Sequence, residues 1–367
     1  MAGRRRSGRP TIADVAARAG VGAITVSRAL REPSKVSPEL RRNIEQAVSD
    51  LDYIPNLNAR ALASRRTDVV AVLVPSLTQN IFSDVLRGIY DGVEDSGLRI
   101  DIANTRYNPQ REEDQIVAIL RHRPAAIIIS GVEQTAACRK MLDSAGCPVV
   151  QIMDLTRDPI QKIIGFSHEQ AGRSMTEHLI EAGYRRIGFF AGWLNSRSHE
   201  RFDGYRKALE AAGTFDPGLV GLMGNEDDPA RADYHQFSNA MMGRQLMEQM
   251  FDSRPDIDAI FCNNDVLSLG ALFACHARGV PVPERMGIAG FNDFDYMEAA
   301  TPGLSSVRIH RWRCGYEAMH AVRHQLEGGD IGERVVDLGF EIMKRRSTDR
   351  NGVLNEPVVG EIPYIQG

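Results

Sequence analysis

Two arginines of this chain have polar neighbours in the sequence, and their guanidinium groups could bind a partner through paired hydrogen bonds. In the segment VGAITVSRAL, residues 21–30, Arg28 follows Thr25 and Ser27, and its guanidinium fork could bond the O6 and N7 atoms of a guanine. In the segment SRSHERFDGY, residues 196–205, Arg201 could hold the two oxygens of a carboxylate. Each arginine needs an element of structure that presents it to such a partner.

Catalytic and metal-binding patterns are weak by comparison. His320 and His324 have the i, i+4 spacing of a metal-binding pair, but the segment HAVRH has Ala321 where a zinc protease motif needs glutamate. Glu317 could serve as a third ligand, although a solvated pair is the simpler interpretation. No G-x-G-x-x-G follows an expected strand, and neither a P-loop nor a G-x-S-x-G motif occurs. We therefore predict no enzyme activity, no metal and no cofactor.

The charge of the chain is divided between its two parts. Residues 1–66 contain thirteen Lys or Arg and six Asp or Glu, whereas the remainder contains 31 basic and 42 acidic residues. A basic head on an acidic body indicates that the head meets a polyanion, although a solvated basic tail would give the same count. Five scattered cysteines, the lack of a membrane-length apolar run and the lack of an apolar segment behind the first arginines predict a reduced protein of the cytoplasm.

Three short helices are expected in residues 1–55. Thr11 can cap the first helix and Gly20 can end it, while Ser37 can cap the third helix. The second helix turns Val26 and Ala29 inward. Its outward residues are then Ala23, Ile24, Thr25, Ser27 and Arg28. This pattern predicts a helix-turn-helix whose second helix enters the major groove of DNA, and a generic small helical bundle is the alternative.

These residues resemble the DNA-binding headpiece of the lactose-repressor family. The resemblance rests on TIADVAARAGV, TVSRAL, KVSPELRRNIEQAVSDLDYIPN and NARALAS, and it runs without a gap from Thr11 to Ser64. It implies that Ala23, Ile24 and Arg28 read bases. Around these readers, the remaining DNA contacts are expected from Thr11, Thr25, Ser27, Ser37, Tyr53 and Asn56. Since Ala23 and Ile24 replace the usual polar residues, they can touch a thymine methyl group but cannot donate or accept a hydrogen bond.

Residues 56–66 form a separate hinge and linker in this interpretation. The segment NLNARALAS is helix-prone but too short to be a stable helix alone. The resemblance implies that two such helices pair in the minor groove, with Ala59 allowing their approach and Leu62 wedging a base step apart. Simple packing of Leu62 in a linker is the alternative.

Residues 67–367 alternate short apolar runs with amphipathic segments. Nine runs read as buried strands, from VVAVLVPSL at residues 69–77 to LSSVRI at residues 304–309. Regular alternation predicts an α/β fold with parallel sheets and helices on both faces, and the length suggests two similar lobes. A single α/β enzyme is the alternative.

This body resembles the two-lobed, periplasmic-binding-protein-like sensor of the same family, which holds a small effector between its lobes. Motifs such as HERFDGY, CNND and GFND carry the resemblance. It implies an effector site formed by Asn80, Phe82, Ser130, Asp154, Arg201, Phe237, Asn264, Asp265 and Asn292. Any polar member could instead be a strand-end cap. Asn292 stands where many relatives have aspartate, so an anionic ligand costs less here.

The expected function is that of a dimeric, sequence-specific transcriptional repressor with a palindromic double-stranded DNA operator. The stretches VPSLTQNIFSDVLRGI and AIFCNNDVLSLGALF resemble the gluconate-repressor branch of the family, which together with Arg201 favours a sugar acid such as gluconate or a ketogluconate as inducer. A neutral sugar stays open. The C-terminal segment lacks a leucine heptad, so a homodimer is expected. The rival interpretation is a sugar-binding or sugar-modifying protein with an unrelated basic N-terminal segment.

Overall fold

The computed structural model describes residues 10–31, 33–53, 67–192, 194–222 and 238–353. The chain divides into two compact units between Thr67 and Asp68. Among the described residues, no helix combines the length and the apolar character needed to cross a membrane.

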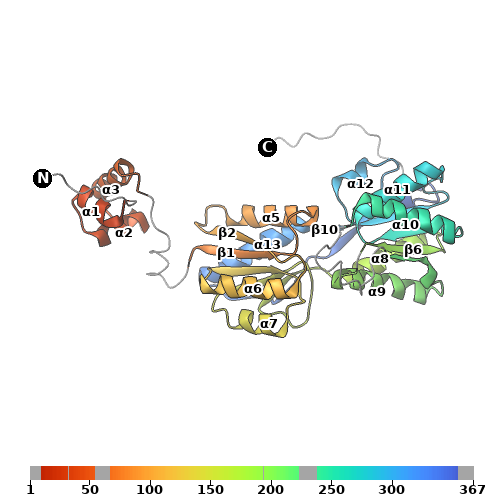
Figure 1. Ribbon diagram of the computed structural model, residues 1–367, viewed down its shortest axis with the longest axis horizontal. Helices are drawn as coiled ribbons and strands as arrows, with labels where there is room; N and C mark the ends of the chain where they lie inside the picture. Colours follow the sequence, from red (N-terminus) through yellow and green to blue (C-terminus); the bar gives the residue numbers. More distant parts are fainter. Residues whose placement is uncertain (1–9, 32, 54–66, 193, 223–237, 354–367) are drawn as a thin grey trace. The chain divides into compact units, whose positions relative to one another are not determined.

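The first unit is a small bundle of three helices (Figure 1). They are α1 (Ile12–Ala19), α2 (Ala23–Arg31) and α3 (Pro38–Asp50). Thr11 and Asp14 form a capping box, in which Thr11 Oγ accepts from the Asp14 backbone and Asp14 Oδ2 accepts from the Thr11 backbone. Gly20, at φ +67°, ends α1 in the left-handed conformation. The buried side chains include Val15, Val26 and Ile44, so the expected inward face of the second helix is confirmed.

The second unit contains two sheets, one for each lobe. The sheet of the N-terminal lobe has the strand order β11-β5-β4-β3-β1-β2 and is parallel throughout. Its strands are β1 (Val69–Val74), β2 (Arg99–Asn104), β3 (Ala126–Ser130), β4 (Val149–Ile152), β5 (Lys162–Gly165) and β11 (Val335–Asp337). Helices α5 (Asn80–Val93) and α13 (Arg311–Leu326) cover one face, and α6 (Pro109–Arg121) and α7 (Ala136–Asp143) cover the other (Figure 1).

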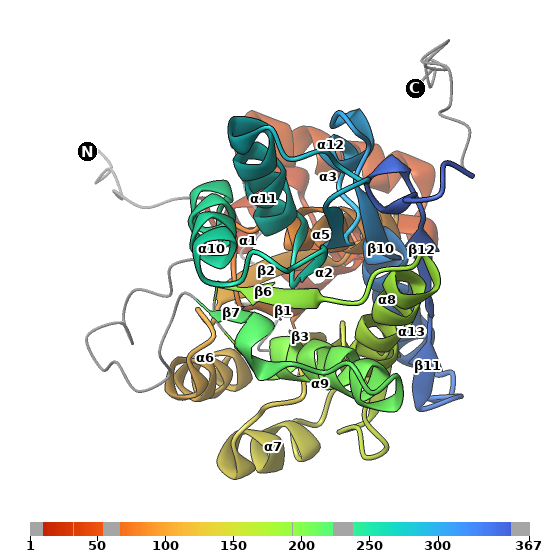
Figure 2. The same ribbon diagram turned by 90° about the vertical axis from the view of Figure 1, so that its right-hand side faces the viewer.

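The C-terminal lobe repeats this architecture with the order β12-β10-β9-β8-β6-β7. Its strands are β6 (Ile187–Ala191), β7 (Val220–Leu222), β8 (Ala259–Cys262), β9 (Gly287–Asn292), β10 (Ser305–Ile309) and β12 (Phe340–Met343). Only β12 is antiparallel to its neighbour. Helices α8 (His168–Glu181) and α9 (Ser196–Ala211) lie on one face, and α10 (Ala240–Ser253) and α11 (Asp265–Arg278) lie on the other, while the short α12 (Asp295–Ala299) follows β9 (Figure 2).

The chain crosses between the two lobes three times: after β5, after β10 and after β11. The expected α/β class, with parallel sheets and helices on both faces, is confirmed. Because the carboxyl ends of parallel strands meet at one edge of each sheet, the loops that follow the strands converge on the cleft between the lobes.

Paired glycines bring the helices of three of the four covering layers into backbone contact. A Cβ atom on Gly88 of α5 would collide with the Trp312 carbonyl of α13, and one on Gly315 of α13 would collide with the Val85 carbonyl of α5. Gly172 and Gly204 join α8 to α9 in the same way, and Gly243 and Gly270 join α10 to α11. Each pair of helices is therefore packed more closely than any side chain would permit.

We expect Gly88→Ala to lower the free energy of unfolding of the second unit by about 2 to 3 kcal/mol, because α5 and α13 must separate to admit the methyl group. Urea denaturation followed by circular dichroism measures the change. Ser83→Ala, at an exposed position of the same helix, is the matched control and should stay within about 0.5 kcal/mol. Equal stabilities of the two variants would contradict the close-packing argument.

Candidate functional site

Helix α2 presents a continuous outward face. Ala23, Ile24, Ser27 and Arg28 are exposed and Thr25 is half-buried, with Ile24 retaining 78% of its accessible surface. These positions lie one turn apart on the helix, opposite the buried Val26 and Ala29. An exposed isoleucine beside an exposed arginine is suited to a groove that offers both a methyl group and a guanine edge.

Among the described residues, the other expected DNA contacts are two exposed helix caps and one buried tyrosine. Thr11 and Ser37 use their hydroxyl oxygens as helix caps, accepting from the backbone N–H groups of Asp14 and Leu40, and both stay exposed at a helix N-terminus. Tyr53 is only 8% exposed and packs in the core of the bundle, so its ring has a structural role that the sequence analysis did not predict. The expected contacts Asn56, Ala59 and Leu62 lie outside the described residues.

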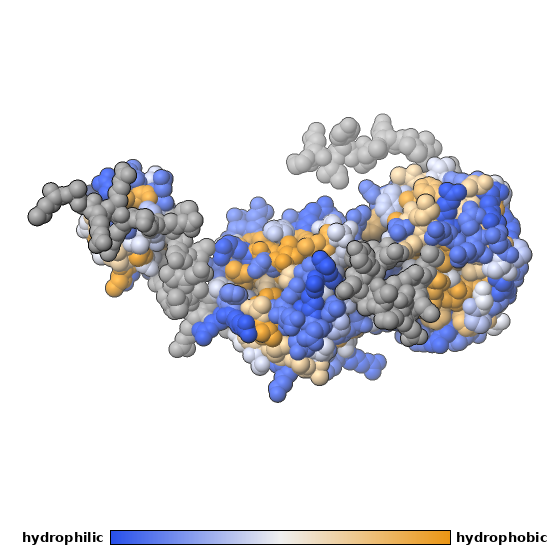
Figure 3. Space-filling view, viewed as in Figure 1, coloured by the Kyte–Doolittle hydropathy of each residue, from blue (hydrophilic) through white to orange (hydrophobic). Residues whose placement is uncertain are grey.

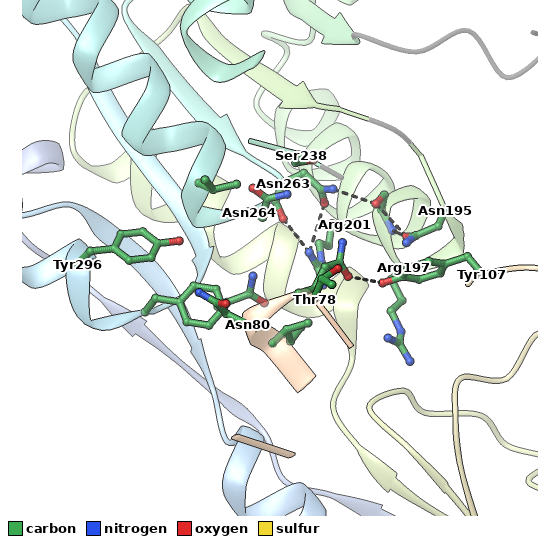
Figure 4. A pocket seen from close by; sticks show the side chains of 16 residues that line it. Thr78, Asn80, Tyr107, Asn195, Arg197, Arg201, Ser238, Asn263, Asn264 and Tyr296 are labelled. Carbon is green, nitrogen blue, oxygen red and sulfur yellow. Dashed lines mark hydrogen bonds between the residues drawn. The ribbon is translucent and has the colours of Figure 1, made fainter. Parts of the chain in front are cut away.

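A cavity of about 300 Å³ lies between the two lobes of the second unit (Figure 4). Four expected effector residues line it: Asn80 from the start of α5, Arg201 from α9, Asn264 before α11 and Asn292 at the end of β9. A small set of polar side chains around a partly apolar cavity of this size is typical of a small-molecule site. The structure thus brings together residues that are more than two hundred positions apart in the sequence.

Arg201 is the most informative side chain of this cavity, because it is only 5% exposed. Its Nε donates to His168 Nδ1 at 3.1 Å, and its Nη1 donates to the Asn263 carbonyl at 2.7 Å. The guanidinium lies 3.7 Å from the centroid of the Phe291 ring. No carboxylate among the described residues forms an ion pair with it. Burial, together with the neighbouring Arg197 charge, lowers the pKa of Arg201 to about 9.

Arg197 belongs to the same helix, but its charge is compensated. Its Nε lies 2.8 Å from Asp154 Oδ2, and its Nη2 donates to the Ser130 hydroxyl at 2.9 Å. Although burial opposes ionisation of Asp154, the Arg197 charge and the His168 hydrogen bond hold the pKa of this carboxyl well below its usual range. Since Ser130 ends β3 and Asp154 follows β4 in the N-terminal lobe, this buried ion pair joins the lobes across the cleft.

His168 links the two arginines in its neutral form. Its Nε2 lies 3.0 Å from the Met153 carbonyl and 3.3 Å from Asp154 Oδ1, so this nitrogen carries the proton while Nδ1 accepts from Arg201. Burial, followed by the Arg201 charge, lowers the pKa of His168 to about 4. The neutral ring therefore fixes the orientation of the Arg201 guanidinium.

Several expected effector residues lie elsewhere. Phe82 is buried in the core and does not line the cavity, because the first turn of α5 directs it towards the sheet. Asp265 is also fully buried, and it accepts from the Ser306 hydroxyl and the Phe294 backbone behind the cavity. Ser130 and Asp154 line an adjoining smaller cavity. Phe237 lies outside the described residues.

Some residues that line the main cavity were not predicted from the sequence. They include Thr78, Gln79, Tyr107, Asn195, Ser198, Asn263, Phe294 and Tyr296. Tyr107 follows β2 and Phe294 follows β9, so the rule that ligands bind beyond the carboxyl ends of strands could have identified both. Asn195 caps α9 by accepting from the Ser198 backbone, and its position before SRSHERF was a visible capping signal.

We expect the pH dependence of stability to report the buried neutral His168. Its native pKa lies below the unfolded value, so as the pH falls from about 6.5 to 4 the unfolded chain takes up the proton first and the native state loses up to about 3 kcal/mol. His168→Gln keeps a donor and an acceptor but does not titrate. Urea denaturation over this range should show a smaller loss for the variant than for the wild type, and parallel curves would contradict the assignment. His178, buried with a pKa of about 4, contributes to both curves.

Known protein families match parts of both units. Residues 11–56 match the family described as bacterial regulatory proteins, lacI family, and residues 176–348 match the periplasmic binding protein-like domain. The HTH-type transcriptional regulator GntR of Pseudomonas aeruginosa is 38% identical over 344 residues, which cover 94% of this chain and 97% of that relative.

Solved structures agree with this result. A LacI-family transcriptional regulator from Silicibacter pomeroyi superposes with a TM-score of 0.83 at 33% identity, covering 93% of this chain and all of that chain. The complex of the transcriptional regulator CelR with cellobiose gives a TM-score of 0.64 at 28% identity, covering 92% of this chain and all of that one. The similar proteins are named as regulators and span both units, which excludes the rival of an unrelated basic segment on a sugar-modifying protein. The chain belongs to the LacI family of DNA-binding transcriptional regulators.

Proposed function

We propose that this regulator is a repressor whose operator affinity is lowered by a sugar acid, such as gluconate or a ketogluconate, bound between the two lobes. One observation carries the proposal: Arg201 is a buried cation in the cleft without a carboxylate partner among the described residues. A buried charge is costly unless it is paired, so an anionic ligand would supply the missing partner. Its carboxylate could accept from Nη2, since the hydrogen bonds of Arg201 to other described residues involve Nε and Nη1 only.

The other lining residues suit a polyhydroxylated ligand. Amides of Asn80, Asn195, Asn264 and Asn292 surround the cavity and together offer donors and acceptors to hydroxyl groups, although the Asn195 oxygen already accepts from Ser198. Asn292 is the most telling of them, because its Oδ1 is buried without a hydrogen-bond partner in the structure. Cellobiose bound to the relative CelR supports a carbohydrate here. The uncompensated charge of Arg201 favours an acid over the neutral sugar that the sequence left open.

We further propose that the repressor acts in the cytoplasm as a homodimer on a palindromic operator, since each copy of the chain supplies one recognition helix. Two exposed apolar groups support a surface for a second copy. Tyr90 of α5 lies exposed, and Trp312 and Tyr316 of α13 stack with ring centroids 4.8 Å apart. Met241 and Phe273 are exposed on α10 and α11. Figure 3 shows apolar residues gathered on the part of the N-terminal lobe where α5 lies in Figure 1.

The proposed residues of the operator interface are Thr11, Ala23, Ile24, Thr25, Ser27, Arg28 and Ser37, with Arg28 as the principal base reader. We expect Arg28→Ala to weaken operator binding by about 1 to 3 kcal/mol while binding to a random duplex changes much less. Fluorescence anisotropy with both duplexes, over a series of salt concentrations, measures the difference. Arg42→Ala, at an exposed position of α3, is the matched control and should affect the two duplexes equally. Equal losses for Arg28→Ala would remove it as a base reader.

The effector proposal is tested by adding D-gluconate, 2-ketogluconate or D-glucose to the wild-type protein on its operator. We expect an acid to release the duplex and glucose to have little effect. Arg201→Met should weaken the response to the acid about 100-fold or more, because a charged hydrogen-bonded pair is lost, while operator binding without ligand is kept. Arg206→Met, at a half-exposed position of the same helix beside Asp203, is the control and should respond normally. Release by glucose alone would show that the ligand is a neutral sugar.

A further inference from the structure

We propose that Tyr107 and Arg197 form a partition that restricts the effector to a single sugar unit, and that the smaller cavity behind them is a polar chamber able to take a second, neutral sugar unit once Tyr107 is removed. This inference rests on the proposed function, because it concerns the length of the ligand held in the same cleft. It assigns the choice of ligand length to a residue that contributes no charge to the site.

The two cavities lie on either side of the same side chains. The main cavity, of about 300 Å³, and the smaller one, of about 60 Å³, share only Tyr107, Asn195 and Arg197 among their described lining residues. Tyr107 comes from the N-terminal lobe and Arg197 from the C-terminal lobe, and Figure 4 shows them next to each other at one end of the main cavity. The wall between the cavities is thus made by one side chain from each lobe, completed by Asn195.

Tyr107 is held firmly in this position. Its hydroxyl donates to Gln79 Oε1 at 2.7 Å, and Gln79 itself precedes α5. Arg106 and Tyr107 both adopt left-handed backbone angles, with φ of 53° and 54°, directly before Asn108 caps α6 by accepting from the Arg111 backbone. Two consecutive left-handed residues without glycine are unfavourable and persist only where the surroundings enforce them. This turn directs the ring into the cleft.

Arg197 forms an equally fixed half of the wall. Its bonds to Asp154 and Ser130 engage Nε and Nη2, so the guanidinium cannot swing aside without leaving a buried carboxylate unpaired. Tyr107 therefore is the half of the partition that a substitution can open without breaking the ion pair between the lobes.

The chamber behind the wall has the chemistry of a hydroxyl-binding site. Its lining offers oxygen acceptors from Glu112, Glu133, Gln134 and Asn108. Burial raises the pKa of the Glu112 carboxyl to about 7, which also allows this group to donate. A second carboxylate would be repelled by Glu133, whereas the hydroxyl groups of a neutral sugar would find partners. A ligand that spans both cavities would thus keep its carboxylate at Arg201 and place a neutral sugar unit in the chamber, as an aldobionic acid would.

The test compares a short and a long acid on the full chain by isothermal titration calorimetry, with D-gluconate and lactobionate as probes. Tyr107→Asn removes the ring while asparagine tolerates the left-handed backbone, and Tyr107→Phe keeps the ring but loses the bond to Gln79. We expect the wild type to prefer gluconate about 100-fold, Tyr107→Asn to reduce this preference to about tenfold or less, and Tyr107→Phe to retain it. Thermal unfolding verifies that each variant is folded.

Two results would overturn the partition: a wild type that binds lactobionate as tightly as gluconate, or a folded Tyr107→Asn variant with an unchanged preference. If the wild type binds neither acid, the proposed sugar-acid function fails, and the same variants are titrated with D-glucose and cellobiose. Because the wall acts through the volume of the ring and not through charge, the preference for the shorter sugar must then fall in Tyr107→Asn. An unchanged preference for glucose would overturn the partition independently.

Discussion

The buried ion pair between Arg197 and Asp154 is the interaction on which the cleft depends. Arg197 comes from the C-terminal lobe and Asp154 from the N-terminal lobe, so their contact joins the lobes beside the cavity. Two isolated charges would be too costly at this depth, and together they neutralise each other. The pair also leaves the charge of Arg201 without a carboxylate partner among the described residues. With Asp154 engaged, neither it nor the neutral His168 can compensate Arg201. The cleft therefore retains one positive charge, which is the basis of the anionic ligand that we propose.

The positions of these charges depend on the close packing of α8 and α9, whose backbones meet at glycine residues. Gly172 on α8 meets the backbone of Arg201 on α9, and Gly204 on α9 meets the Glu169 backbone on α8. This approach brings His168, the first residue of α8, within hydrogen-bond distance of the Arg201 side chain, one turn beyond the contact. A bulkier residue at either glycine would separate the helices and with them the two ends of the polar network. The close packing of α8 and α9 in the C-terminal lobe is thus required for the hydrogen bond between His168 and Arg201 in the site.

The sequence predicted the larger elements well because their signals are local. Buried strands such as β1 and β3 are continuous apolar runs, and Thr11 and Ser37 are caps that can be read from their neighbours. The short edge strands β7, β11 and β12 were missed, since each has only three or four residues and is only partly buried. In the site, motifs located Arg201, Asn264 and Asn292, whereas Phe82 and Asp265 were misplaced because a strand end or a helix start does not reveal which side of the chain faces the cleft. Tyr107 was not predicted because its role depends on the conformation of the turn between β2 and α6.

Arginine serves opposite purposes in the two units. Arg28 is exposed on α2, so its charge is hydrated in the free protein, and the contribution we propose for it on DNA is discrimination between bases. Arg201 is already dehydrated before any ligand arrives, and burial beside Arg197 lowers the pKa of its guanidinium. An anion that enters the cleft therefore relieves an existing cost in addition to forming new bonds. Since Asn80 of the N-terminal lobe and Arg201 of the C-terminal lobe line the same cavity, an anionic ligand bound between them would favour the closed arrangement over an open one. By linkage, whatever arrangement of the lobes the operator-bound protein prefers must in turn change the affinity for that anion by the same factor.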